Sequence, residues 1–298
     1  MKKAFSLIEL SIVILIIGIL VAGVTASSRL VFQMKLAASR SLTAGSPVST
    51  ISGLMMWFET TLERSLDENL ANTDQIAAWN DINPQSTYKY TLSQSNATYR
   101  PTYVKSGIGG IPSINFSSDH FQLDNITLPL NYSIFIVLRK SSAPNVNGMD
   151  IISMSNSNNF GLLFEIQPNS GAYLGYNRRF RALHRYPGTA TENDNYTTAS
   201  NLIQDNNDYI VSFSRNYNSV SNIYLNGTIA SDSANSLATV NQFGEVMFSL
   251  LIGNLLPGNL QRPFDGMISE IIFFDRALKN DEITHINKYL AKKYSIKI

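Results

Sequence analysis

The sequence predicts a mainly β protein in which a long N-terminal helix precedes an antiparallel β-sandwich of the jelly-roll type and a C-terminal helix. Three observations support this fold class. An uncharged apolar run from Leu10 to Ser28 is long enough for a membrane-crossing helix. Beyond residue 52, short strand-like segments alternate with turn residues. Near the C-terminus, apolar residues at helical spacing occupy residues 281–294.

The N-terminal helix is expected over residues 5–44. A helix needs about 20 residues to cross the hydrocarbon core of roughly 30 Å. From Arg29 to Leu42 polar and apolar residues are mixed, which indicates that the helix continues as an amphipathic segment outside the membrane. Gly45 and Pro47 then break it. We therefore expect a linker at residues 45–51.

Charged residues at the start of the chain restrict its topology. Lys2 and Lys3 hold this end in the cytoplasm by the positive-inside rule. Glu9 lies early in the apolar run, where a carboxylate costs roughly 2.5 to 3.5 kcal/mol at the bilayer centre on insertion scales. A secretory signal peptide cleaved after Ala26, or a plain signal anchor, accounts for the lysines and the apolar run. Neither accounts for the acid.

The segment Lys2-Lys3-Ala4-Phe5-Ser6-Leu7-Ile8-Glu9 resembles the leader of type IV pilins and type II secretion pseudopilins. The resemblance implies that a prepilin peptidase cuts after Ala4, where the family usually has Gly, and N-methylates Phe5. Residues 1–4 are then the leader. Glu9 becomes the fifth mature residue and pairs with the new amine of a neighbouring subunit. The signal-peptide interpretation predicts a mature start at Ser27 instead.

The same resemblance implies the location and partners of the chain. It would be a single-pass protein of the bacterial inner membrane with its C-terminal domain in the periplasm, and after assembly part of a pilus or pseudopilus, including the cell surface. The expected partners are other pilin or pseudopilin subunits, the peptidase, and a glycan or protein ligand. The formal net charge of +1 gives no bulk attraction to nucleic acid, which is not among the expected partners.

Residues 52–298 are expected to form one sandwich domain, since about 250 residues suffice for a hydrophobic core. Cysteine is absent, so disulfides cannot hold the fold. Turn signals at Asn226-Gly227 and Asp265-Gly266 separate strands. Strands are expected at Leu54 to Phe58, Ser113 to Phe116, Ser133 to Leu138, Gly161 to Ile166, Tyr209 to Ser214, Ser221 to Leu225, Val246 to Ile252 and Met267 to Asp275.

Segments of this domain resemble the concanavalin A-like (laminin G-like) lectin/glucanase superfamily. In chain order they are Trp79-Asn80-Asp81, Tyr99 to Val104 with Gly107 to Phe116, Tyr132 to Val137, Ile223 to Thr228, Leu251-Ile252-Gly253 and Phe264 to Leu278. The resemblance implies two antiparallel sheets packed face to face, with a carbohydrate or protein ligand on loops or on a concave face. It does not identify the ligand, because one fold hosts many functions.

No enzyme activity is expected from these residues. Glucanases of this superfamily carry Glu-x-Asp-x-x-Glu along one strand, and retaining glycosidases need two carboxyl groups about 5 to 5.5 Å apart. The sequence lacks this string. Glu165 has no acidic partner two residues away and is expected to be a solvated strand residue. His120, His184 and His285 are scattered, without ligand spacing, and are expected to be structural or exposed.

One segment of the domain is a candidate ligand-binding surface. Residues 173–186 hold Arg178, Arg179 and Arg181 among aromatic residues that include Tyr176 and Tyr186. Arginine with interleaved aromatics can bind sugars, phosphates or single-stranded nucleic acid. The alternative is a solvated edge strand whose arginines discourage association between sheets.

A Ca²⁺ site is the one cofactor site that the sequence leaves open. Its candidate ligands are Asp81 with Asn83 in one loop, Asp119 in another, and residues 192–194 in a third. The alternative is that these side chains stabilise turns through hydrogen bonds to the backbone.

The sequence therefore favours a minor pilin or pseudopilin subunit whose lectin-like head mediates adhesion to a glycan or protein. A structural pseudopilin of a type II secretion system, contacting secreted substrate, is the alternative. A head of about 250 residues would crowd its neighbours along a filament, which favours a tip or sparse position.

Overall fold

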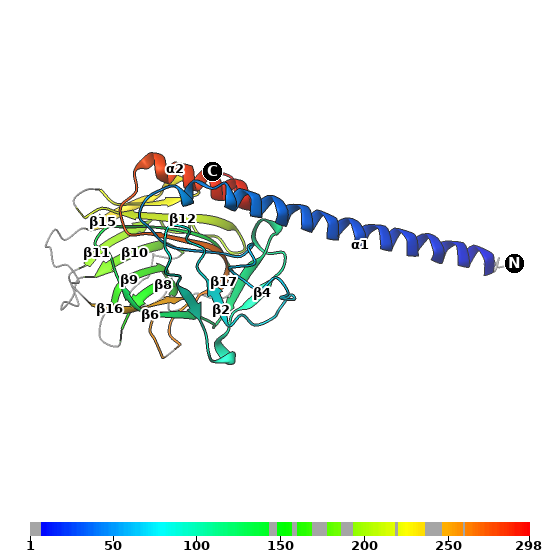
Figure 1. Cartoon of the computed structure of the whole chain (residues 1–298), viewed down its shortest axis with the longest axis horizontal. Coiled ribbons are helices and arrows are strands. Elements are labelled where there is room, and N and C mark those ends of the chain that lie inside the picture. The colour runs from blue at the N-terminus through cyan, green and yellow to red at the C-terminus, as the bar shows by residue number, and fades with distance from the viewer. Residues whose placement is uncertain are drawn as a thin grey trace.

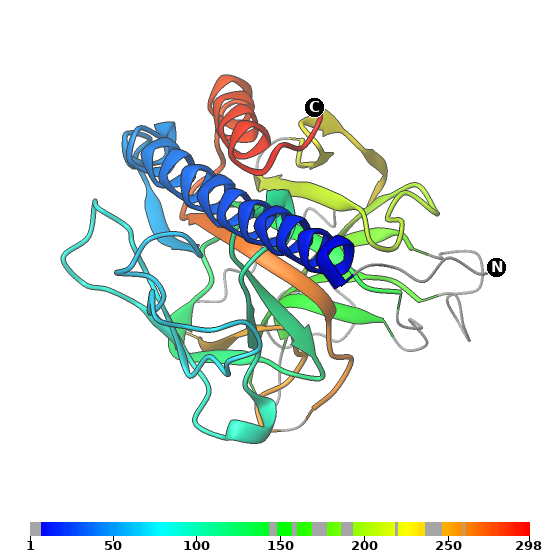
Figure 2. The same cartoon turned by 90° about the vertical axis from the view of Figure 1, so that its right-hand side faces the viewer.

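The structure is a computed structural model that describes residues 7–142, 148–156, 160–168, 178–185, 193–217, 220–235, 246–258 and 260–298. Helix α1 (Leu7–Ala44) projects from a β-sandwich head, and its last turns lie against the head (Figure 1). Figure 2 looks toward the free end of this helix and shows the strands of the head behind it. The predicted fold class is confirmed: a long helix, two antiparallel sheets and a C-terminal helix follow one another.

The first sheet, sheet A, has eight strands among the described residues. In spatial order they are β14 (Thr228–Ile229), β13 (Asn222–Leu225), β12 (Asp208–Arg215), β7 (Tyr132–Lys140), β17 (Asp265–Phe274), β5 (Ser113–Ser117) and β4 (Thr102–Val104), with β1 (Leu54–Glu59) also paired to β17. The long strand β17 lies at its centre, because β7 pairs along one side and β5 and β1 share the other.

The second sheet, sheet B, has nine strands among the described residues. They are β15 (Ser231–Asn235), β11 (Asn193–Thr198), β10 (Phe180–Arg185), β9 (Phe160–Ile166), β8 (Met149–Ser155), β16 (Met247–Ile252), β6 (Phe121–Thr127), β3 (Thr91–Ser93) and β2 (Ala78–Asn80). Three short 3₁₀ helices lie in connections: η1 (Pro47–Ser49) between α1 and β1, η2 (Ala97–Tyr99) between β3 and β4, and η3 (Ile108–Gly110) between β4 and β5. The eight segments predicted as strands all fall on strands of these two sheets.

Strand β7 shows why sheet A is apolar on both faces. Ile134 and Ile136 point into the core between the sheets. Phe135 and Val137 alternate with them and belong to a second apolar cluster on the outer face. A strand covered on both faces forms a continuous apolar run, as residues 134–138 of β7 do.

The outer face of sheet A is covered by helix α2 (Asn280–Tyr294). Ile283, Ile286 and Leu290 recur at helical spacing and are buried against the sheet. The last turns of α1 lie beside α2, where the Thr43 and Tyr289 hydroxyls are 3.3 Å apart (Figure 1). The second cluster thus joins the head to the end of α1.

A buried ion cluster lies under α2. Lys293 Nζ is 2.9 Å from Glu59 Oε2 on β1 and 2.8 Å from Glu270 Oε2 on β17, and all three side chains are fully buried. Burial alone would lower the pKa of Lys293, but the two carboxylates outweigh it and raise that pKa above its ordinary value. Burial likewise opposes the charge of Glu59, yet Lys293 and hydrogen bonds from Thr61 hold the Glu59 pKa below its usual range.

Hydrogen bonds satisfy the remaining oxygens of the cluster. Glu59 Oε2 accepts from the Thr61 amide (2.8 Å) and hydroxyl (2.6 Å). Glu270 accepts from three aromatic side chains: Trp57 Nε1 (2.8 Å), the Tyr289 hydroxyl (2.9 Å) and the Tyr294 hydroxyl (2.8 Å). Charges buried this deeply persist where their oxygens and protons are all bonded. The cluster therefore fixes α2 on the strands β1 and β17.

The free part of α1 is apolar on its surface. The helix is long and apolar enough to cross a membrane, and the most apolar part of it is exposed. Closer to the head, Arg40 Nε donates to the Thr61 carbonyl (2.8 Å), and its Nη1 lies 3.0 Å from Glu63 Oε1. Ser39 and Thr43 are buried there. The head is thus attached to the helix through α1's last turns.

We predict that Lys293→Met destabilises the head severely. The substitution leaves Glu59 and Glu270 buried without their cation, which costs on the order of 3 to 5 kcal/mol in comparable sites. Thermal unfolding of the full chain in detergent, followed by tryptophan fluorescence, should show a Tm lower by on the order of 10 °C.

The matched control is Lys292→Met, which removes the adjacent but exposed ammonium of the same helix. It should leave the Tm within a degree or two of wild type, as surface substitutions usually do. Equal Tm values for the two variants would show that the buried cluster does not hold the head together.

Candidate functional site

The described part of the arginine-rich segment, residues 178–185, contains the interior strand β10. Strand β10 pairs with β9 on one side and β11 on the other, so the interpretation of residues 173–186 as a protected edge strand was wrong. Ala182 and His184 face the core between the sheets. Arg181 and Leu183 therefore face the outer side of sheet B.

Two buried carboxylates lie across this outer face. Asp150 on β8 and Glu165 on β9 are register partners, and Arg181 on β10 is the next residue in the row. Arg181 contacts Glu165, and Arg262 contacts both acids, with its Nε 3.0 Å from Asp150 Oδ2. Asp150 and Glu165 are 0% and 1% exposed. The expectation of a solvated Glu165 was wrong, because arginines from β10 and from the 253–264 connection lie over it.

Burial dominates the ionisation of Asp150. It raises the pKa of this carboxyl from 3.8 to about 7, although Arg262 and Arg181 act in the opposite direction. A carboxyl group with a pKa in this range titrates near physiological pH. Its ionisation must therefore affect the stability of the fold.

The other predicted binding residues contact the head itself where they are described. Arg178 Nη2 lies 2.7 Å from Asp205 Oδ2, and Arg179 Nε donates to Gln167 Oε1 at 2.9 Å. Tyr176 and Tyr186 lie outside the described residues. The ligand-binding role of this segment stays a prediction.

The candidate calcium ligands make turn contacts. Asp81 Oδ1 accepts hydrogen bonds from two backbone amides, including that of Asn83 at 2.8 Å. Asp119 Oδ2 accepts from the Ser117 amide at 3.0 Å. Glu192 lies outside the described residues. Among those that are described, no group of three or more His, Cys, Asp or Glu side chains could hold a metal ion.

The processing and assembly residues lie at the free end of α1. Ala4 and Phe5 fall outside the described residues, and Glu9 lies in the first turn of the helix on its exposed surface. Their roles stay predictions.

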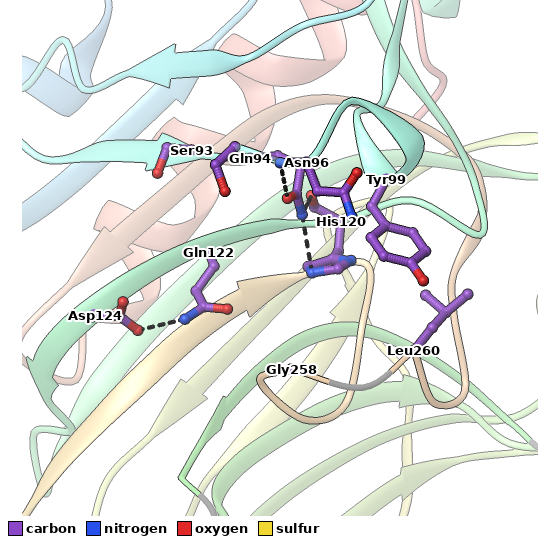
Figure 3. A pocket seen from close by; sticks show the side chains of 10 residues that line it. Ser93, Gln94, Asn96, Tyr99, His120, Gln122, Asp124, Gly258 and Leu260 are labelled. Atoms are coloured by element: carbon purple, nitrogen blue, oxygen red, sulfur yellow. Dashed lines mark hydrogen bonds between the residues drawn. The ribbon is translucent and has the colours of Figure 1, made fainter.

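A polar pocket of about 350 Å³ opens at the edge of sheet B (Figure 3). Its walls come from the paired strands β3 and β6, the 3₁₀ helix η2 and the turn at Gly258. Ser93 and Gln122 are register partners, so pairing of the two strands brings a hydroxyl and an amide together. On the η2 side of the pocket, Tyr99 lies next to Leu260 (Figure 3).

The floor of the pocket is a fixed pair, Gln94 and His120. Gln94 Oε1 accepts from the Asn96 amide (3.0 Å), which orients the side chain so that its NH₂ group donates to His120 Nε2 (3.0 Å). The ring proton is therefore on Nδ1. This atom is buried and bonds to no described residue. Burial lowers the pKa of His120, so the ring is neutral at pH 7.

The rim of the pocket keeps hydrogen-bonding capacity. Asn96 Oδ1 accepts from the Thr98 amide, which leaves its NH₂ group to donate elsewhere. Gln122 Nε2 donates to Asp124 Oδ1 at 2.7 Å, which leaves the amide oxygen as an acceptor. The Tyr99 ring lies with its centroid 5.7 Å from that of His120. The pocket thus offers donors, acceptors and an aromatic surface.

Sequence reasoning missed this pocket. Its residues come from segments 93–99, 120–124 and 258–260, which only sheet pairing brings together. One available signal was the unbroken polar run Ser93-Gln94-Ser95-Asn96 followed by Tyr99.

The chain belongs to the Concanavalin A-like lectin/glucanases superfamily, because residues 115–284 match this family and make up more than half of the 298 residues. The resemblance of the head to this superfamily is confirmed. The match covers no part of α1. The comparison with curated proteins gives no match.

Solved structures with similar folds are distant in sequence. The binding domain of botulinum neurotoxin serotype D/C has 12% identity and a TM-score of 0.50, and the match covers 82% of this chain and 53% of that one. Domain 4 of an extracellular arabinanase from Geobacillus stearothermophilus, in complex with arabinotriose, has 16% identity and a TM-score of 0.44. The match covers 63% of this chain and 81% of that one. Trypanosoma rangeli sialidase has 12% identity and a TM-score of 0.46, and the match covers 81% of this chain and 33% of that one. The matched region is thus about half of the toxin domain and a third of the sialidase.

These comparisons correct the expectation that the chain is not an enzyme. The arabinanase and the sialidase are enzymes, and chains of both match this chain. The absence of one Glu-x-Asp-x-x-Glu string therefore does not exclude catalysis, and the expectation that excluded it was wrong. Likeness at 12% and 16% identity shows the fold alone and assigns no reaction.

We predict that Asp150 makes the head less stable as the pH rises. Between about pH 4 and 7 the unfolded chain has lost this proton while the folded head keeps it, so stability falls over this range. Asp150→Asn is neutral at every pH. The difference in free energy of unfolding between Asp150→Asn and wild type should therefore increase by up to about 1.4 kcal/mol per pH unit between pH 5 and pH 7. Above pH 7 this difference should level off.

The measurement is thermal unfolding of both proteins at pH 5, 6, 7 and 8. Asp232→Asn, at an exposed position, is the control for the loss of one carboxyl group. A constant difference between Asp150→Asn and wild type across the series would contradict the raised pKa.

Proposed function

We propose that the chain is a minor subunit of a type IV pilus or a pseudopilus, and that its lectin-like head binds a glycan. The observation that carries this proposal is the exposed apolar surface of α1, attached to a folded head by its last turns. A subunit built in this way can leave the membrane and pack its helix against those of other subunits while the head stays outside.

The exposed apolar side chains of α1 must be shielded from water. Apolar side chains are exposed around the helix, with Leu7 84%, Ile14 62% and Val24 68% exposed. Lipid can cover them before assembly, and helices of neighbouring subunits can cover them afterwards. Helical assembly through one repeated contact suits a filament.

The leader supports the same proposal. Cleavage before Phe5 would remove Lys2 and Lys3 and create a positively charged amine. In lipid, this amine is the natural partner of Glu9 on an adjacent subunit, because a carboxylate there is costly without a cation. The partners that follow are other pilin subunits and the prepilin peptidase.

Glycan binding is supported by membership of the lectin/glucanases superfamily and by the polar pocket in sheet B. Binding of glycans by the full chain on an array tests this part of the proposal. The alternative, a pseudopilin that contacts secreted protein, predicts that the head binds a secreted protein and no glycan.

We predict that Glu9→Val blocks incorporation into filaments without preventing membrane insertion. Valine makes insertion easier, but it removes the carboxylate that would pair with the amine at Phe5 and set the axial register. Membrane fractions should contain the variant at wild-type level, whereas sheared filaments should contain at least tenfold less.

Ser11→Val is the matched control, because it also places valine on the exposed part of α1. It should enter filaments normally. Recovery of Glu9→Val in sheared filaments at the level of Ser11→Val would refute the assembly role of Glu9.

A further inference from the structure

We propose that the pocket between β3, β6 and η2 is the glycan site of the head, and that it takes an uncharged sugar unit and rejects acidic ones. The inference rests on the proposed glycan-binding function and adds the place and the ligand class. It replaces the arginine-rich segment as the expected binding surface.

The size of the pocket suits a small ligand. Its volume of about 350 Å³ falls within the range of roughly 300 to 1,000 Å³ that ligand pockets occupy. That space holds one or two sugar rings. The pocket is only partly enclosed, so a longer glycan can extend into solvent.

The polar groups of the pocket match hydroxyl chemistry. A sugar hydroxyl both donates and accepts, and the rim offers an amide donor on Asn96, an amide acceptor on Gln122 and the hydroxyls of Ser93 and Tyr99. The Gln94–His120 floor is held by its own hydrogen bonds. Groups that are fixed before binding lose little entropy when a ligand arrives.

Apolar contacts are confined to one side. Tyr99 and Leu260 lie next to one another at one side of the pocket in Figure 3. The C–H face of a sugar ring can pack on the Tyr99 ring while its hydroxyls reach the polar rim. Tyrosine is suited to this role because it joins an apolar ring to a polar tip.

The charge of the pocket selects against acidic glycans. Among the described residues that line it, Asp124 is the charged one, and none is Lys or Arg. His120 is neutral at pH 7 because burial lowers its pKa. A sugar carboxylate or sulfate would meet the Asp124 carboxylate, whereas the nearby Arg100 guanidinium already donates to the Gln94 and Ser95 carbonyls. Like charges placed together cost affinity.

The test uses the full chain in a zwitterionic detergent, because maltoside detergents carry a sugar that would compete. A glycan array with neutral, N-acetylated, sialylated and uronic acid-containing glycans is probed with wild type, Gln122→Ala, Tyr99→Ala and Asp124→Asn. Thr127→Ala, an exposed change further along β6, is the matched control. The Tm of each variant is measured, and variants within about 2 °C of wild type are compared.

Wild type should bind neutral glycans in preference to acidic ones. Gln122→Ala and Tyr99→Ala should each weaken binding at least tenfold, Thr127→Ala should bind as wild type, and Asp124→Asn should gain affinity for acidic glycans. Glycan binding that survives both pocket variants would overturn the inference and leave the proposed function in place. A preference for acidic glycans would also overturn it. Failure to bind any glycan would overturn the proposed function together with the inference.

Discussion

The ammonium group of Lys293 is the point on which the head and its helix depend. It joins α2 to β1 and β17 through two buried carboxylates, and every oxygen of these carboxylates is bonded. Tyr289, which donates to Glu270, also lies beside Thr43 of α1. One polar network under α2 therefore connects the core of sheet A with the end of the long helix. An apolar cluster alone would allow α2 to slide, whereas directional bonds to buried charges fix its position.

This attachment gives the two parts of the chain different tasks. The free length of α1 presents apolar side chains that lipid or other helices must cover, while the head carries its polar pocket in sheet B, away from the face that α2 covers. Contacts made by the helix and contacts made by the pocket therefore do not compete for the same surface. The proposed function, in which a filament subunit also binds a ligand, needs this separation.

Sequence patterns predicted what local chemistry determines. Short apolar runs bounded by turn residues located β7, β12 and β17, and the spacing of Ile283, Ile286 and Leu290 located α2. Features that depend on long-range pairing were missed. Glu59 and Lys293 are 234 positions apart, so no local signal joins them. The sequence predicted a solvated Glu165 because Arg181 and Arg262, which cover it, come from other segments of the chain. The pocket was missed for the same reason, since strand pairing creates it from scattered polar residues.

The central claim is that the head is fixed on α1 and moves with it as one body. The chain has no cysteine, so Ser28→Cys on the helix and Thr127→Cys on sheet B provide unique sites for spin labels. Electron–electron distance measurement on the doubly labelled protein in detergent should give one narrow distribution, and adding Lys293→Met should broaden it. A broad, multi-component distribution in the protein with Lys293 intact would contradict the account, because it would show that the head swings freely on its helix.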